Sequence, residues 1–200
     1  MLYLVRHGQT YWNAALKMQG RVDIPLNDVG REQAAKAGAL LAGVHLDAVY
    51  ASPFSRTVET AKIVLGGRDL PIIRKGLLVE QAYGLSEGLP REVAQAPGGP
   101  MEGYGKDPAN FKPDIGGESF EELRERAQRV ISEILIPAEE TYENTLVVAH
   151  GALFCSVYSV LMGLETKDFW KPKLENGGIG RLRLEKGKLV VLPGLPQEPA

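Results

Sequence analysis

The sequence predicts an α/β sandwich with a mainly parallel sheet and an antiparallel hairpin at one edge. Short apolar runs rich in strand formers alternate along the chain with stretches of helical periodicity, which is the order of parallel βαβ units. Residues 180–192 alternate in hydropathy around Lys186-Gly187, as expected of a hairpin. With 200 residues, 44% of them hydrophobic, the chain can build a sizeable core. We therefore expect a single domain over residues 1–200.

Local signals place the individual elements. Asn27 or Asp28 can cap the first helix, and Ser119 followed by Glu122 forms a capping box that begins the third. Gly66-Gly67 supplies the end of the second helix, and Pro137 is expected to end the third. Strands are expected at residues 2–5, 47–51, 72–73 and 145–149, helices at 28–41, 57–65, 119–137 and 152–162, and a loop at 12–23.

Two stretches lack such periodicity. Residues 84–117 are crowded with glycine and proline, and a long irregular segment inside a compact domain is usually functional or disordered. We expect this segment to form a flap over a site, and the alternative is a plain surface loop. The proline-rich tail from Pro193 is expected to be a surface strap or disordered.

Chemistry-bearing side chains follow four of the apolar runs. These groups are Arg6 with His7, then Arg56, Glu80 and His150. Because parallel strands present their carboxyl ends along one edge of a sheet, we expect these groups to converge in one cleft. Such a set forms a cationic pocket for a dianion with tetrahedral oxygens.

A histidine in that pocket can attack phosphorus while the arginines stabilise the spreading charge. Glu80 could then protonate the leaving alkoxide. A non-catalytic phosphate-binding module would need the arginines but has no evident use for the carboxyl group. A metal site built from His7, His150 and Glu80 is a further alternative, which the two nearby arginines disfavour by repelling a cation.

Composition bounds the cellular setting and the partners. The net charge of -2 argues against a general nucleic-acid binder, and no apolar stretch approaches membrane-spanning length. The single cysteine, Cys155, excludes an internal disulfide and fits a reducing compartment, and the first strand begins at Met1, which leaves no room for a signal peptide. We expect a cytoplasmic protein with no nucleic-acid or membrane partner, acting on a small phosphorylated molecule.

The chemistry-bearing residues also lie in blocks that carry a family resemblance. Arg6-His7-Gly8-x-Thr10-x-x-Asn13 resembles the opening signature of the histidine phosphatase superfamily, the phosphoglycerate mutase-like proteins. The likeness continues in family order through Gln19-Gly20-x-x-Asp23, Pro25-Leu26-x-x-x-Gly30, Gln33-Ala34, Ser52-Pro53-x-x-Arg56, Thr60-Ala61, Glu80, Gly84, Glu87-Gly88, Gly117-Glu118-Ser119 and Val147-Val148-Ala149-His150-Gly151.

The resemblance implies a three-layer αβα sandwich and a set of residue roles. His7 would be the phosphorylated nucleophile, and Glu80 would act first as acid and then as base. No metal and no cofactor would be required. The residues that would bind the phosphoryl group are Arg6, Asn13, Arg56, His150 and Gly151.

The sequence resembles the small phosphatases of that superfamily, such as the alpha-ribazole-5'-phosphate phosphatases, more than its mutases. Cofactor-dependent phosphoglycerate mutases usually carry a basic residue and a histidine after the glutamate, whereas Gln81-Ala82 follow Glu80 here. The adjacent arginine pair that holds the glycerate carboxylate in mutases is absent from residues 84–117. Hydrolysis is therefore the expected reaction and a mutase the alternative. The edge hairpin permits dimerisation, so a monomer or a homodimer is expected.

Four further side chains have two possible roles each. Trp12 and Tyr83 could line the pocket or pack beneath the flap. Arg91 and Lys106 lie in the flap, where they could touch a second anionic group of a substrate, but a solvated surface charge is the more ordinary interpretation.

Overall fold

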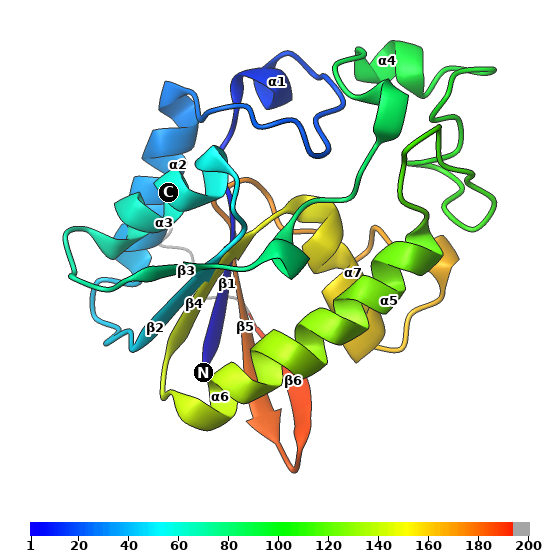
Figure 1. The fold of residues 1–200 in the computed structure, drawn as a ribbon. Helices are drawn as coiled ribbons and strands as arrows, with labels where there is room; N and C mark the ends of the chain where they lie inside the picture. The colour runs from blue at the N-terminus through cyan, green and yellow to red at the C-terminus, as the bar shows by residue number, and fades with distance from the viewer. Residues whose placement is uncertain (194–200) are drawn as a thin grey trace.

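The fold is built on one six-stranded sheet, in the order β3-β2-β4-β1-β5-β6 (Figure 1). The computed structural model describes residues 1–193. β2, β3 and β4 run parallel to β1, whereas β5 and β6 form an antiparallel hairpin at one edge. This confirms the predicted fold class and the edge hairpin, while the expected strap beyond Pro193 lies outside the described residues. The strands are β1 Leu2–Arg6, β2 Ala48–Ala51, β3 Ile72–Arg74, β4 Thr145–Ala149, β5 Ile179–Glu185 and β6 Lys188–Leu192.

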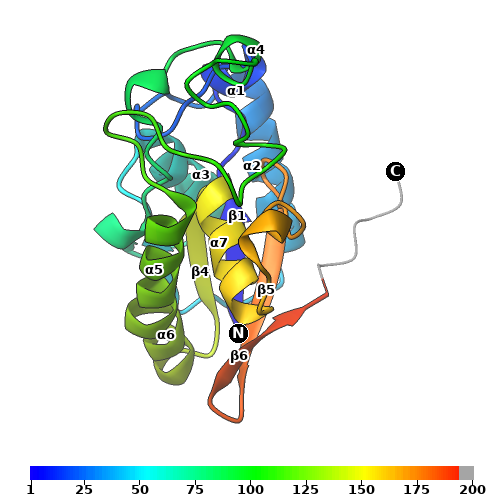
Figure 2. The same cartoon turned by 90° about the vertical axis from the view of Figure 1, so that its right-hand side faces the viewer.

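Helices cover both faces of the sheet, which makes three layers (Figure 2). Leu2 and Leu4 pack in the core beneath α5 and α7, whereas Tyr3 and Val5 pack in a second core beneath α2 and α3. This is the alternation that a strand buried on both faces requires. The α-helices are α1 Tyr11–Ala14, α2 Asp28–Leu40, α3 Ser55–Leu65, α4 Arg91–Ala94, α5 Phe120–Val130, α6 Ile136–Thr141 and α7 Gly151–Leu161.

The predicted helix starts are confirmed by their capping hydrogen bonds. The Asn27 side chain accepts from the backbone N–H of Gly30 at 2.9 Å and caps α2. Ser119 and Glu122 exchange side-chain and backbone hydrogen bonds in the capping box of α5. Local sequence therefore fixes where these two helices begin.

Three local expectations were wrong. The helix that begins at Phe120 does not end at Pro137, because a π-helical turn at Ile131–Leu135 leads into α6 and places Pro137 in its first turn, where no N–H is needed. The expected loop at 12–23 includes the single-turn helix α1. Glu80 follows a 3₁₀ turn at Gly76–Leu78 rather than a strand end.

The segment 84–117 contains little regular structure, a 3₁₀ turn at Gly84–Ser86 and α4, and lies above the carboxyl ends of β1 and β4 (Figure 1). Aromatic packing anchors it to the body of the protein. The ring of Tyr104 lies 5.4 Å from Phe120 in α5 and 5.1 Å from Trp170, measured between ring centroids. Trp170 follows a further 3₁₀ turn at Thr166–Asp168.

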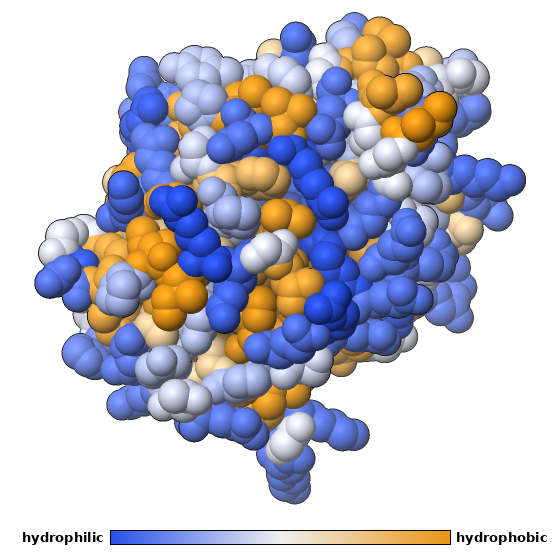
Figure 3. Space-filling view, in the orientation of Figure 1, coloured by the Kyte–Doolittle hydropathy of each residue, from blue (hydrophilic) through white to orange (hydrophobic). Residues whose placement is uncertain are grey.

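The surface in Figure 3 is mixed, with polar and apolar residues interspersed. Apolar atoms gather at its left side, over the end of α3 and the start of β3. Leu65, Leu70 and Ile72 line a shallow hollow there. β3 is an edge strand, and its Ile73 is 37% exposed.

A close backbone crossing holds the loop after β1 against the first turn of α2. A Cβ atom added to Gly30 would overlap the carbonyl oxygen of Gln9, and one added to Gly8 would overlap that of Gly30. Only glycine at both positions allows the two backbones to lie this close. The crossing fixes the loop that carries His7.

We expect Gly30→Ala to lower the free energy of unfolding by about 1–3 kcal/mol, because backbone atoms must move to admit the methyl group. Chemical denaturation measures this loss. Gly43→Ala is the matched control, since a Cβ atom at Gly43 meets nothing within 4 Å. Equal unfolding free energies for the two variants would show that the crossing is not tight.

Candidate active site

His7 is the first residue after β1, and the backbone fixes its imidazole. Its N–H donates to the carbonyl of Ala149 at 3.0 Å, which continues the β1–β4 ladder by one residue. The ring Nδ1 lies 2.7 Å from the carbonyl oxygen of Gly8, which can only accept. Nδ1 therefore carries the proton of the neutral ring, and Nε2 keeps its lone pair.

The surroundings of His7 keep it neutral. Its side chain is buried, with 3% of its surface exposed. Burial lowers the pKa of His7 well below its usual value, and the positive charges of Arg56 and Arg6 lower it further. A neutral imidazole with an unprotonated Nε2 is the form that can act as a nucleophile.

His150 follows β4 and lies beside His7, with ring centroids 5.2 Å apart. Nε of Arg56 donates to Nδ1 of His150 at 3.3 Å, so the proton of this ring is on Nε2, which lies 2.8 Å from Oγ of Ser52. Burial lowers the pKa of His150 well below its usual value, and the charge of Arg56 adds to this shift. The two histidines are thus both neutral and close together.

Arg56 lies in the first turn of α3 with no exposed surface. Its Nη1 donates to the carbonyl of Val22 at 2.8 Å, and its Nη2 donates to that of Gly20 at 2.9 Å. With its amide oxygen turned to Arg56, Gln19 accepts from Nε at 2.8 Å and from Nη1 at 3.2 Å, and the single N–H of Nε is then shared between Gln19 and His150. Burial lowers the pKa of Arg56 to about 10, while the negative charge of Glu80 opposes this shift. The guanidinium remains charged at neutral pH.

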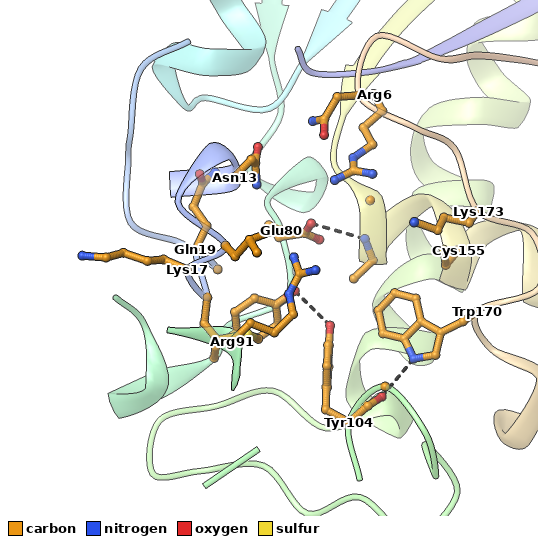
Figure 4. Close-up of a pocket in the computed structure, with 18 of the residues that line it drawn as sticks. Arg6, Asn13, Lys17, Gln19, Glu80, Arg91, Tyr104, Cys155, Trp170 and Lys173 are labelled. Carbon is orange, nitrogen blue, oxygen red and sulfur yellow. Dashed lines mark hydrogen bonds between the residues drawn. The ribbon is translucent and has the colours of Figure 1, made fainter. Parts of the chain in front are cut away.

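Glu80 points into the same region from the segment after β3. Its Oε1 accepts from the backbone N–H of Leu153 at 3.1 Å and its Oε2 from that of Ala152 at 3.2 Å, so the carboxyl group lies at the N-terminus of α7 (Figure 4). Arg21 and Arg126 donate to the backbone carbonyl of Glu80 at 3.0 and 3.3 Å. These contacts fix both the main chain and the side chain of Glu80.

A cavity of about 480 Å³ opens over these groups. It is lined by five of the seven residues expected at the site, namely Arg6, His7, Asn13, Glu80 and Gly151. The other two, Arg56 and His150, do not line it and have no exposed surface. The fold therefore brings the expected residues together in two layers, with His150 against His7 beneath the cavity floor.

Arg6 keeps donor capacity for a ligand. Its Nη1 donates to the carbonyl of Leu174 at 2.8 Å, whereas its buried Nε finds no partner among residues 1–193. A buried N–H without a hydrogen-bond acceptor costs free energy, and an anion bound in the cavity would supply the acceptor that the described residues do not.

The cavity has an outer part that the sequence patterns did not assign. Arg91 of the segment 84–117 lines it, while Lys106 lines hollows elsewhere. Tyr83 lines it too and also packs against Tyr104 of this segment, so both roles expected of it hold, whereas Trp12 does not line the cavity. Figure 4 shows Arg91 together with Lys17, Tyr104, Trp170 and Lys173 around the cavity. The remaining side chains at this outer part are Lys17, Gln95, Tyr104, Trp170, Lys173 and Glu175.

Residues 1–193 contain no group of three or more histidine, cysteine, aspartate or glutamate side chains placed to hold a metal ion. No helix within this range is both long and apolar enough to cross a membrane.

The chain belongs to the histidine phosphatase superfamily (branch 1), whose family model matches residues 2–193. It is therefore an enzyme of the phosphoglycerate mutase-like type. The two histidines, the two arginines and the carboxyl group described above are the residues that carried this resemblance in the sequence.

Individual relatives include both phosphatases and mutases. The uncharacterized phosphatase PhoE of Bacillus subtilis is 34% identical over 80% of this chain and 76% of its own. The solved structure of YhfR from Bacillus stearothermophilus aligns with a TM-score of 0.86 at 32% identity, covering 95% of this chain and 94% of that one. The alpha-ribazole phosphatase of Shigella flexneri aligns with a TM-score of 0.85 at 26% identity, covering 98% and 96%. 2,3-bisphosphoglycerate-dependent phosphoglycerate mutases are also among the relatives.

The two buried histidines predict how stability depends on pH. The pKa values of His7 and His150 are lowered in the folded state. Below the usual histidine pKa, the unfolded chain therefore binds protons at these two residues, whereas the folded chain does not. Stability is therefore complete above the unfolded pKa of about 6.5 and falls as the pH drops below it, by roughly 1 kcal/mol per pH unit for each histidine.

Denaturant titrations between about pH 7 and pH 5, in buffer without phosphate, would measure this slope. His150→Asn should reduce it, whereas His45→Asn should not, since the His45 side chain is 87% exposed. A stability that stays constant over this range would contradict the assignment of neutral histidines.

Proposed function

We propose that this enzyme hydrolyses a small phosphomonoester through a phosphohistidine on His7, without a metal ion. The observation that supports it most is the state of His7, a buried neutral imidazole with a free Nε2, on a residue that lines the cavity together with Arg6 and Glu80. This arrangement combines a nucleophile, a cation for the phosphoryl oxygens and a proton carrier in one place.

In the first step, Nε2 of His7 attacks phosphorus and the bond to the ester oxygen breaks. We propose that Arg6, Asn13 and Gly151 bind the phosphoryl oxygens from the cavity side. Arg56 does not line the cavity, and one N–H of its Nη2 is the only one of its N–H groups without a partner among the described residues, so this N–H would bind a phosphoryl oxygen. His150 would exchange its hydrogen bond with Ser52 for one to a phosphoryl oxygen.

Glu80 balances the protons of both steps. As an acid it protonates the leaving alkoxide, and as a base it then takes a proton from the water that attacks the phosphohistidine. The second step breaks the N–P bond and releases inorganic phosphate, so His7 and Glu80 return to their starting states. The position of Glu80 on the cavity wall is compatible with both steps.

Hydrolysis is favoured over a mutase reaction by what the outer part of the cavity contains. A mutase must hold the carboxylate of its substrate and keep water from the phosphohistidine. Arg91 is the only arginine in residues 84–117, so the adjacent pair is absent. We propose that this segment acts as a flap that sets substrate choice, in a single domain that works in the cytoplasm as a monomer or homodimer.

Replacing the proposed acid separates catalysis from binding. We expect Glu80→Gln to slow the hydrolysis of alkyl phosphates by about 10²–10⁴-fold, because an alkoxide cannot leave without a proton. Aryl phosphates should lose much less, since a phenolate leaves unprotonated. Steady-state release of inorganic phosphate from matched alkyl and aryl esters measures the difference.

The same assay tests the metal-free proposal when a chelator is present. Activity should persist with the chelator, and loss of activity that a divalent ion restores would overturn this part. Glu139→Gln is a control for the loss of a carboxylate, because Glu139 binds the N-terminus in a different region. Equal losses for aryl and alkyl esters in Glu80→Gln would exclude Glu80 as the acid, and tight phosphate binding without turnover in the wild type would favour a binding module.

A further inference from the structure

A chain of three hydrogen bonds begins beside Glu80 and ends at Tyr83 on the wall of the cavity. Nε2 of Gln81 donates to the carbonyl of Glu118 at 2.8 Å. The hydroxyl of Tyr104 lies 2.9 Å from Oε1 of Gln81 and 2.9 Å from the hydroxyl of Tyr83 (Figure 4 shows the latter bond leaving Tyr104). Tyr83 and Tyr104 both line the cavity.

The direction of each hydrogen bond follows from counting protons. The carbonyl of Glu118 only accepts, which fixes the amide of Gln81 with its oxygen toward Tyr104. Tyr104 has a single hydroxyl proton, and the amide oxygen requires it. The oxygen of Tyr104 can then only accept from Tyr83, so the one proton of Tyr83 is also committed.

The opposite direction is disfavoured by burial. If Tyr104 gave its proton to Tyr83, the buried oxygen of Gln81 would face a lone pair at 2.9 Å and stay unsatisfied. Gln81 has no exposed surface, so no water can replace the lost donor. Both phenols also keep their protons, because burial raises the pKa of Tyr83 and of Tyr104 above the usual value.

Packing holds the chain of hydrogen bonds in place. The ring of Tyr104 stacks on Phe120 at 5.4 Å, and the indole N–H of Trp170 donates to the backbone carbonyl of Tyr104 at 2.9 Å. Tyr83, which lines the cavity, therefore has a hydroxyl oxygen with a lone pair to accept a hydrogen bond but no proton to give.

We propose that Tyr83 is a specificity-determining residue that accepts a hydrogen bond from a hydroxyl group on the leaving group of the substrate. The inference rests on the proposed hydrolase function and narrows its substrate class to hydroxyalkyl phosphates, such as esters of polyols or sugars. A neutral hydroxyl fits better than an ammonium group. The outer cavity holds the cations of Arg91 and Lys17, which would repel a positive donor. The charges of Lys173 and Glu175 there pair with each other at 3.0 Å.

Three esters of similar size test the acceptor role, namely 2-hydroxypropyl, 2-oxopropyl and propyl phosphate. The informative quantity is the ratio of kcat/KM for the hydroxy ester to that for the propyl ester. Intrinsic reactivity and any general loss of activity cancel when this ratio is compared between variants. We expect Tyr83→Phe to lower it about five- to tenfold, the usual net effect of one hydrogen bond.

Tyr104→Phe tests the direction of the hydrogen bonds. It removes the acceptor for the Tyr83 proton, so Tyr83 can turn that proton to the substrate. The oxo ester, which can only accept, should then gain relative to the hydroxy ester. A role of Tyr104 in packing alone would not change this preference, because phenylalanine keeps the ring. Tyr142→Phe, at the end of α6 and outside the cavity lining, is the matched control and should leave both ratios unchanged.

The outcomes separate this inference from the proposed function. Wild-type enzyme that hydrolyses none of the esters would overturn the hydrolase function. Wild-type enzyme that hydrolyses them, with the same ratios in Tyr83→Phe and Tyr104→Phe, would overturn the acceptor role alone. A preference of the wild type for 2-aminoethyl over 2-hydroxyethyl phosphate would overturn the assignment of a neutral hydroxyl.

Discussion

The parallel pairing of β1 with β4 is the interaction on which the site depends. Their register sets Arg6 opposite Ala149, so the next residues along the two strands, His7 and His150, emerge side by side. Both strands are buried on each face of the sheet, and a shift of register by one residue would turn every apolar side chain to the wrong layer. The hydrophobic cores thereby hold the two imidazoles 5.2 Å apart.

Burying the charged side chain of Arg56 beside the two neutral histidines costs free energy, which hydrogen bonds must offset. Arg56 has no exposed surface, and a buried guanidinium is costly unless its N–H groups have partners. Carbonyl oxygens of Val22 and Gly20 supply them from the loop after α1. The same positive charge then favours the neutral forms of both histidines. One buried arginine thus supports the loop and, together with burial, keeps the proposed nucleophile His7 neutral.

The sequence was sufficient to predict those elements that are determined by interactions between residues close together in the chain. The strands, the caps at Asn27 and Ser119 and the edge hairpin follow from residue pattern alone, and the motifs around His7 and His150 were adequate to predict that their side chains meet. The prediction that Pro137 ends the helix was wrong. A π-helical turn precedes α6 and places Pro137 in the first turn of that helix, where its missing N–H is not needed.

The outer cavity could not be predicted in the same way. Trp170 and Lys173 belong to the connection between α7 and β5, and nothing in that connection resembles a motif. They reach the site only because aromatic packing joins this connection to Tyr104. The direction of the hydrogen bonds from Glu118 to Tyr83 likewise depends on four residues that meet in space, namely Glu118, Gln81, Tyr104 and Tyr83. The outer cavity is therefore shaped by tertiary contacts, whereas the groups proposed to react are encoded by short segments.

A rapid-quench experiment with a radiolabelled phosphomonoester tests the central claim most directly. During turnover the label should appear on His7 as an acid-labile and base-stable phosphohistidine, and it should vanish in His7→Ala. A chase with unlabelled 3-phosphoglycerate should release the label as inorganic phosphate, because water takes the phosphoryl group. Label that persists in His7→Ala would contradict the assignment of the nucleophile, and label that passes mainly into bisphosphoglycerate would show that the enzyme is a mutase.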